Sequence, residues 1–127
     1  MEDELQLLPP IPGPHTVGGA GYTHAIPYYE RILREGLNAY ETRVKALPPG
    51  DFREGLTEVL AGIRAYRNRC LALLASSGAP ECLRRALERV PFLPAQNLYE
   101  ALVSWNFLYY VDGCDNPGPL DRDLGAF

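Results

Sequence analysis

NLYEALVSWNFLYYV, residues 97–111, is the stretch that decides the fold. Asn97 followed by Glu100 is typical of a helix N-terminus, because each side chain can cap a backbone N–H group near the other. Eleven of the fifteen positions are apolar or aromatic, and at 3.6 residues per turn they go round the whole circumference. A helix with this pattern is typically buried on every side, so we predict that it is the central helix of an all-α protein. The other helices predicted for this chain are too few to surround it, so we expect its burial to need further protein, either a second copy of the chain or the remainder of a larger protein.

Three further helical patterns precede this helix. Pro27 suits the first position of a helix, and LPPG at 47–50 ends the pattern that begins there, since proline lacks the N–H that a continuing helix needs. The apolar residues between these points recur at the spacing of one helical face: Tyr29, Ile32, Leu33, Gly36, Leu37, Tyr40 and Val44. We therefore expect a single helix between Pro27 and the LPPG sequence.

The next pattern predicts a longer helix. Asp51 and Glu54 resemble a capping box with Asp in place of Ser or Thr, and SSGAP at 76–80 ends the pattern. A short helix follows at about 80–90, stopped by PFLP at 91–94. The expected buried face of the long helix consists of Phe52, Leu56, Val59, Leu60, Ile63, Cys70 and Leu74.

The N-terminal residues have a different composition. Residues 1–25 hold four prolines and four glycines and show no apolar period. We predict two parts: an extended Pro/Gly-rich arm over 1–25, and a small bundle of about four helices over 26–127.

Charge and targeting signals restrict the partners. The chain has 12 basic and 16 acidic residues and a net charge of −4, which argues against binding nucleic acid, because phosphate contacts need clustered Lys and Arg. The acidic, proline-containing start differs from a signal peptide, and no apolar run is long enough for a membrane span. We expect a cytoplasmic protein with no membrane partner.

Candidate sites for metals and cofactors are weak. His15 and His24 lie in the arm with no other metal-ligating residue type at a suitable spacing, so turn-stabilising hydrogen bonds are the favoured interpretation. GGAG at 18–21 follows no strand and lacks the residues of a phosphate loop. We predict no cofactor and no metal.

Acidic residues near the C-terminus, and one thiol among them, could be taken for a site. DGCDNPGPLDRD, residues 112–123, contains Asp112, Asp115, Asp121 and Asp123, but its prolines do not suit a calcium loop, so turn and cap roles are favoured. Cys114 has no histidine close in sequence, which favours an unreactive thiol.

The remaining thiols and the arginines of the long helix have ordinary interpretations. Cys70, Cys82 and Cys114 are odd in number and unpaired in spacing, so we expect free thiols. Arg64 and Arg67 share one side of the long helix, where a solvated cationic face is expected and an anion contact is the alternative.

Taken as blocks, the chain resembles the N-terminal half of the pyruvate formate-lyase domain of the glycyl radical enzymes. THAIPYYERILREGLNAYETRV at 23–44, RAYRNRCLALLA at 64–75 and LRRALERVPFLPAQNLYEALVSWNFLYYV at 83–111 follow the family's order, with GPLDRDLGAF at 118–127 after them. Matches to the family's His-x-x-Pro-Asp-Tyr-Glu motif are His24, Ile26, Pro27, Tyr29 and Glu30, with Tyr28 replacing the Asp. Matches to its Pro-Ala and Glu-Ala-Leu helix are Pro91, Pro94, Ala95, Glu100, Ala101, Leu102 and Phe107.

The departures from the family pattern concern the substrate cavity. The family's Gly-Arg-x-Asp-Gln-Tyr-Leu is matched at Gly118, Leu120, Asp121 and Leu124, whereas Pro119, Arg122 and Asp123 differ. Gly118, Asp121 and Arg122 are thus expected to be the remnant of a substrate wall. The family's catalytic cysteine and radical glycine lie downstream of this segment, so the resemblance implies no catalytic residue here.

Three functional hypotheses follow. The first is a non-catalytic helical segment or shortened relative of a glycyl radical enzyme, whose parent would be a lyase, dehydratase or decarboxylase. The second is a helical interaction or oligomerisation module that forms a homo-oligomer, with Trp105 and Tyr109 at the interface. An autonomous enzyme that uses Asp121, Arg122 and Asp123 is the remote third.

Overall fold

The described part of the protein is entirely helical. A computed structural model describes residues 28–111, 124, 125 and 127, and all structural statements below concern these residues. The expected arm at 1–25 lies outside them. Five helices and no strand are found in this part, which confirms the all-α prediction: α2 (Tyr29–Glu35), α3 (Leu37–Lys45), α4 (Asp51–Ser76), α5 (Glu81–Arg89) and α6 (Leu98–Val111).

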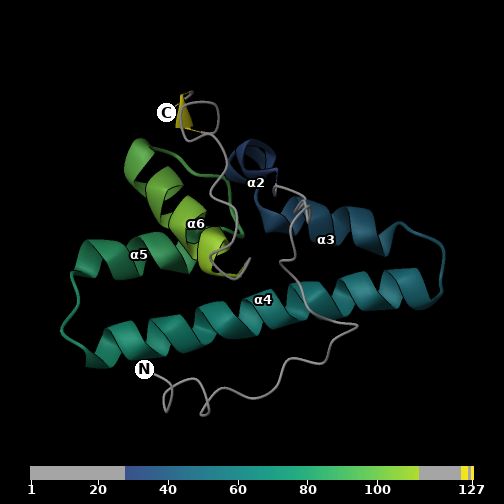
Figure 1. Ribbon diagram of the computed structural model, residues 1–127, viewed down its shortest axis with the longest axis horizontal. Coiled ribbons are helices and arrows are strands. Elements are labelled where there is room, and N and C mark those ends of the chain that lie inside the picture. Colours follow the sequence, from purple (N-terminus) through teal and green to yellow (C-terminus); the bar gives the residue numbers. More distant parts are fainter. Residues whose placement is uncertain (1–27, 112–123, 126) are drawn as a thin grey trace, which may run out of the picture.

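The long helix α4 forms the base of the structure. In Figure 1, α3 and α5 lie along α4 one after the other, and α2 and α6 lie on the far side of them. The inter-helix contacts agree with this order, because α4 packs on α3 and α5 whereas α6 packs on α5 and α2. The core between these layers contains Tyr29, Leu37, Val44, Leu60, Leu87, Phe92, Phe107 and Leu108.

The prediction of a single helix between Pro27 and the LPPG sequence is wrong, because the helix is interrupted at Gly36 and forms two helices, α2 and α3. Gly36 adopts φ 74° and ψ 157°, a region of backbone space that is essentially restricted to glycine. A Cβ atom at this position would lie 2.5 Å from the carbonyl oxygen of Phe92. The break therefore results from a close approach of the chain at residue 92.

That approach is fixed by three backbone hydrogen bonds. The N–H of Leu37 donates to the carbonyl oxygen of Pro91 at 2.8 Å, and the N–H of Asn38 donates to that of Phe92 at 3.1 Å. The N–H of Ala95 donates to the carbonyl oxygen of Leu33 at 2.9 Å. The segment 91–95 thus supplies the polar partners that the broken helix lacks at Gly36.

The start of α4 differs in detail from the expected capping box. Gly50 occupies the N-cap position, and Asp51 is the first residue of the helix. No side chain forms a capping hydrogen bond at this end. The N–H of Glu54 donates to the carbonyl oxygen of Gly50 at 3.0 Å. Asp51 and Glu54 both lie in the first turn, where their negative charges are favourable to the helix dipole.

Two residues of the expected buried face of α4 are exposed. Leu60 is buried as predicted, and Leu56, Ile63, Cys70 and Leu74 pack against the core. Phe52 and Val59, however, are among the most exposed large apolar residues of the described chain. The apolar pattern of α4 is therefore wider than the face that the fold covers.

The start of α6 confirms the predicted cap, whereas its burial is only partial. The N–H of Glu100 donates to Asn97 Oδ1 at 2.9 Å, and Glu100 Oε2 accepts from the N–H of Gln96 at 2.9 Å. Ala101, Ser104, Phe107 and Leu108 are buried, and the rest of the helix is not covered all round by the other described helices, in agreement with the expectation that they are too few to surround it. Exposed apolar residues on α6 are Leu98, Tyr99, Leu102, Tyr110 and Val111.

We predict that Gly36→Ala destabilises the protein strongly. The backbone conformation alone costs a non-glycine residue about 1–3 kcal/mol, and the close approach to Phe92 adds to this cost. Gly55 is the matched control, because it lies inside α4 with open space around it, and Gly55→Ala should raise stability by about 0.5–1 kcal/mol. Urea unfolding followed by circular dichroism measures both, and similar effects of the two changes would contradict the role given to Gly36.

Candidate functional site: an apolar groove between α4, α5 and α6

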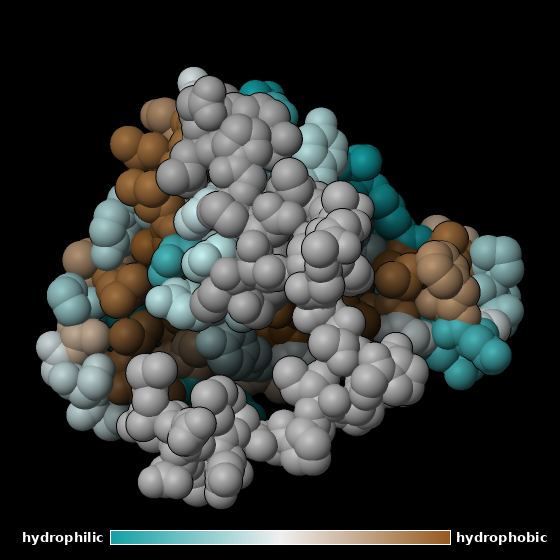
Figure 2. All heavy atoms as spheres, viewed as in Figure 1, coloured by the Kyte–Doolittle hydropathy of each residue, from teal (hydrophilic) through white to brown (hydrophobic). Residues whose placement is uncertain are grey.

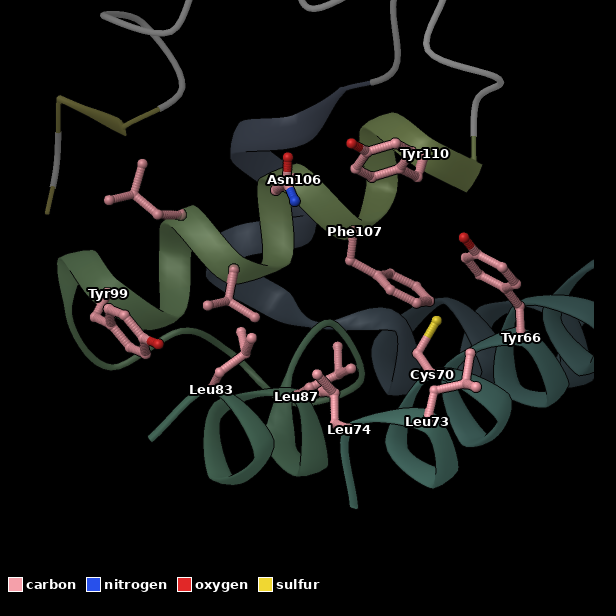
Figure 3. Close-up of a pocket in the computed structure, with 12 residues that line it drawn as sticks. Tyr66, Cys70, Leu73, Leu74, Leu83, Leu87, Tyr99, Asn106, Phe107 and Tyr110 are labelled. Atoms are coloured by element: carbon pink, nitrogen blue, oxygen red, sulfur yellow. The ribbon is translucent and has the colours of Figure 1, made fainter. Parts of the chain in front are cut away.

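An open groove of about 490 Å³ runs between α4, α5 and α6. Figure 3 shows the side chains of Tyr66, Cys70 and Leu73 rising from α4 on one side and that of Phe107 descending from α6 on the other. Leu83 and Leu87 of α5 line the groove between them. Figure 2 shows hydrophobic residues gathered on the left of the molecule, where Figure 1 places α5 and α6.

The groove exists because α4 and α6 are each held by other helices. α5 packs against both of them. The ring of Tyr66 reaches that of Phe107 at 5.4 Å between centroids. Leu73 on α4 and Leu102 on α6 both line the groove while remaining exposed. Core residues thus form the bottom of the groove, and its rim is exposed to solvent.

The lining of the groove is uncharged. Among the described residues that line it there is no Asp, Glu, Lys, Arg or His, and their polar groups are Asn106, a thiol and tyrosine hydroxyl groups. General acid–base chemistry at neutral pH needs a group whose pKa lies near 7, and metal binding needs several anionic or imidazole ligands. The lining suits the binding of an apolar surface, with a few hydrogen bonds at the edge.

A thiol and a phenol meet at one end of this groove. Cys82 Sγ of α5 lies 3.5 Å from the Tyr99 hydroxyl oxygen of α6, and either atom can donate the hydrogen bond. This hydrogen bond, with a smaller effect from desolvation, raises the pKa of Tyr99 above its usual value. Cys70, which lines the middle of the groove, is half-buried, and both cysteines are free thiols as predicted.

The arginines of α4 form a structural contact instead of the expected solvated face. The guanidinium carbons of Arg64 and Arg67 lie 4.0 and 4.6 Å from the ring centroid of Phe92. Arg64 also pairs with Glu41 of α3, and Arg67 donates to the carbonyl oxygen of Glu88 at 3.5 Å. Burial, followed by the charge of Arg64, lowers the pKa of Arg67. Both side chains therefore hold the segment 91–95 against α4.

The residues predicted from the sequence fall in different places. Trp105 is half-buried and stacks on Tyr109, with 5.5 Å between centroids and 12° between planes. Its ring also lies 5.5 Å from that of Tyr29, so these aromatic residues link α6 to α2. The remaining candidates lie outside the described residues: His15, His24, Asp112, Cys114, Asp115, Gly118, Asp121, Arg122 and Asp123.

Sequence reasoning missed the α4 side of the groove. Leu73 and Tyr66 were not among the expected functional residues, although α4 has more apolar positions than one buried face requires. That excess was the available signal. Among the described helices, none combines the length and the apolar character that crossing a membrane requires. No family model, curated protein or solved structure matches this chain.

We predict that Cys82→Ala lowers the pKa of Tyr99 toward that of an ordinary phenol. The hydrogen bond to the thiol is the main cause of the raised pKa, and the substitution removes it. A pH titration of the Tyr99 ring carbon by NMR measures the change. Cys70→Ala is the control, because its thiol is not bonded to Tyr99, and an equal shift in both variants would contradict the assignment.

Proposed function

We propose that this chain is a non-catalytic helical unit of the glycyl radical enzyme type, whose role is to pack against further protein through the α4–α6 groove. The observation that carries the proposal is the open apolar groove, with Leu73, Leu102 and Tyr110 exposed along it. Exposed apolar residues gathered along one groove of a folded protein are typical of an interaction site. Each Å² of apolar surface covered contributes roughly 25 cal/mol.

The chemistry of the groove favours a protein partner over a polar small molecule. The described residues of its lining include no acidic or basic side chain, so a charged ligand would lose its hydration without gaining a partner among them. Leucine and aromatic side chains projecting from a helix fit such a lining by the helix-in-groove mode of recognition. The reactions of the parent family also require a cavity that excludes water, and a wall made of packed helices serves that purpose.

The glycyl radical enzyme type is proposed from the resemblance of the sequence blocks, two of which the fold brings together. Tyr29 and Glu30 of the first block begin α2, and the later block covers the segment 91–95 and α6. The two blocks are joined in the fold by the hydrogen bonds of Leu33 and Leu37 to the segment 91–95. Within the proposal, the unit retains the packing of the family's wall helices without its reactive residues.

The alternative is an independent oligomerisation module that folds and associates without an enzyme of this type. The specific observation that favours it is the exposure of one side of α6, which a second copy could cover as well as a larger enzyme could. Under either alternative we place the protein in the cytoplasm, because the free thiols of Cys70 and Cys82 suit a reducing compartment.

We predict no glycyl radical on this chain. After treatment with a radical-SAM activase, S-adenosylmethionine and a reductant, electron paramagnetic resonance should detect no glycyl doublet, and no lyase or dehydratase turnover should be measured. A full-length glycyl radical enzyme treated in parallel controls for an active activase. A doublet from this chain would show that it is an enzyme and would end the non-catalytic proposal.

We also predict that the groove binds an apolar probe in the folded protein. The neutral dye Nile red should fluoresce with the wild-type chain, and Leu102→Glu should reduce that fluorescence because it places a charge in the groove. Ala61→Glu is the control, since Ala61 is exposed on α4 away from this groove. Equal fluorescence in both variants would mean that the probe binds elsewhere.

A further inference from the structure

α4 carries a line of apolar residues that the fold leaves uncovered. Phe52, Val59, Tyr66 and Leu73 follow one another at intervals of seven and have exposed fractions of 72, 59, 41 and 67%. Because two turns of an α-helix take about seven residues, these four side chains lie in one line along the helix. We call this line the outer strip.

The outer strip and a second set of apolar residues on α4 form one heptad pattern, and the second set packs against the core of this chain. Leu56, Ile63 and Cys70 lie between its members and pack against the core. Together the two sets alternate at spacings of four and three over three heptads, which is the spacing of a coiled-coil seam. One column of the seam packs against the core. The other column is exposed along its length, although the ring of Tyr66 within it also lies 5.4 Å from that of Phe107. The pattern fits a further helix laid along α4.

Small residues lie beside the outer strip. A Cβ atom added at Gly55 or Gly62 would meet nothing within 4 Å. Because the distance between packed helices depends on the side chains at their contact, these positions allow a second helix to approach closely. Gly62 also lines a shallow groove with Val59 and Tyr66, which continues the α4–α6 groove along the helix.

The charges beside the outer strip indicate which helix it accepts. Asp51, Glu54 and Glu58 are exposed on the N-terminal half, and Arg69 is exposed on the C-terminal half. Within the described part of the chain, none of these four forms an ion pair. A helix that is acidic at one end and basic at the other is complementary to itself when two copies run in opposite directions.

We propose that a second copy of this chain covers the outer strip, with the two α4 helices antiparallel about a two-fold axis near the middle of the strip. Val59 of one protomer then packs near Tyr66 of its partner, and Glu58 lies near Arg69 of the opposite helix. A parallel pair would place Glu58 beside Glu58 and Arg69 beside Arg69. The inference deepens the proposed function, because Tyr66 and Leu73 belong both to the strip and to the groove.

Sedimentation velocity of the full chain over a dilution series tests the association. We expect wild type to shift from dimer to monomer on dilution, and Val59→Glu to raise the dimer dissociation constant at least about tenfold, because an unpaired charge would be buried. Ala61→Glu adds the same charge two residues away on another side of α4 and should behave as wild type. Circular dichroism confirms that each variant is folded.

A charge exchange tests the direction of the helices. Glu58→Arg alone should weaken the dimer several-fold, since it places an arginine near Arg69 of the partner, and adding Arg69→Glu should restore it. Both effects should shrink at high salt. In a parallel pair the second change would give no rescue.

Three results would overturn the inference: a wild-type chain that is monomeric at every concentration, a Val59→Glu variant that dimerises like wild type, or a double charge exchange without rescue. Loss of the dimer in Leu102→Glu but not in Val59→Glu would move the interface to α6 and also overturn it. These results are distinguishable from failure of the proposed function, which a glycyl doublet or the lack of probe binding would reveal.

Discussion

The structure depends on the backbone contact between Gly36 and the segment 91–95. Helix α2 ends and α3 begins where the carbonyl oxygen of Phe92 comes too close to allow any side chain at position 36. The three hydrogen bonds across this contact join the first described helices to the loop that precedes α6. They bring the Phe92 ring into the core, where Arg64 and Arg67 of α4 stack on it. One contact therefore positions residues from three separate parts of the chain.

The same contact explains why the groove is open. Because the segment 91–95 is held at Gly36, α6 is directed toward α2 and α5, and the aromatic contacts of Trp105 with Tyr29 and Tyr109 follow on that side. The other side of α6 borders the groove, where Leu102 and Tyr110 are exposed. An apolar helix has thus been placed at the edge of the bundle, which is the physical basis for proposing that more protein packs there.

Local signals predicted the helices, and distant contacts account for what they missed. Prolines and the Asn97 cap mark the limits of α5 and α6 within the sequence itself, so these bounds were close to those predicted. The break at Gly36 was missed because the apolar pattern of 29–44 is continuous, and the Phe92 carbonyl that causes the break lies far along the chain. The residues predicted for an interface, Trp105 and Tyr109, do not line the groove, and Trp105 packs against Tyr29 of α2 instead. Periodicity identifies apolar positions without revealing which of them a neighbouring helix covers.

The Gly36 contact also imposes an order on folding during synthesis. Helix α2 is made early, but the carbonyl and N–H groups that fix its end belong to Pro91, Phe92 and Ala95. A ribosome adds roughly 5–20 residues per second, so the nascent chain spends several seconds with α2 and α3 unsecured while α4 and α5 are made. Among the helices made before then, α3 packs on α2 and α4. The contact at Gly36 therefore forms late, when residues 91–95 have left the ribosome. Its formation closes a long loop of the chain between Gly36 and these residues.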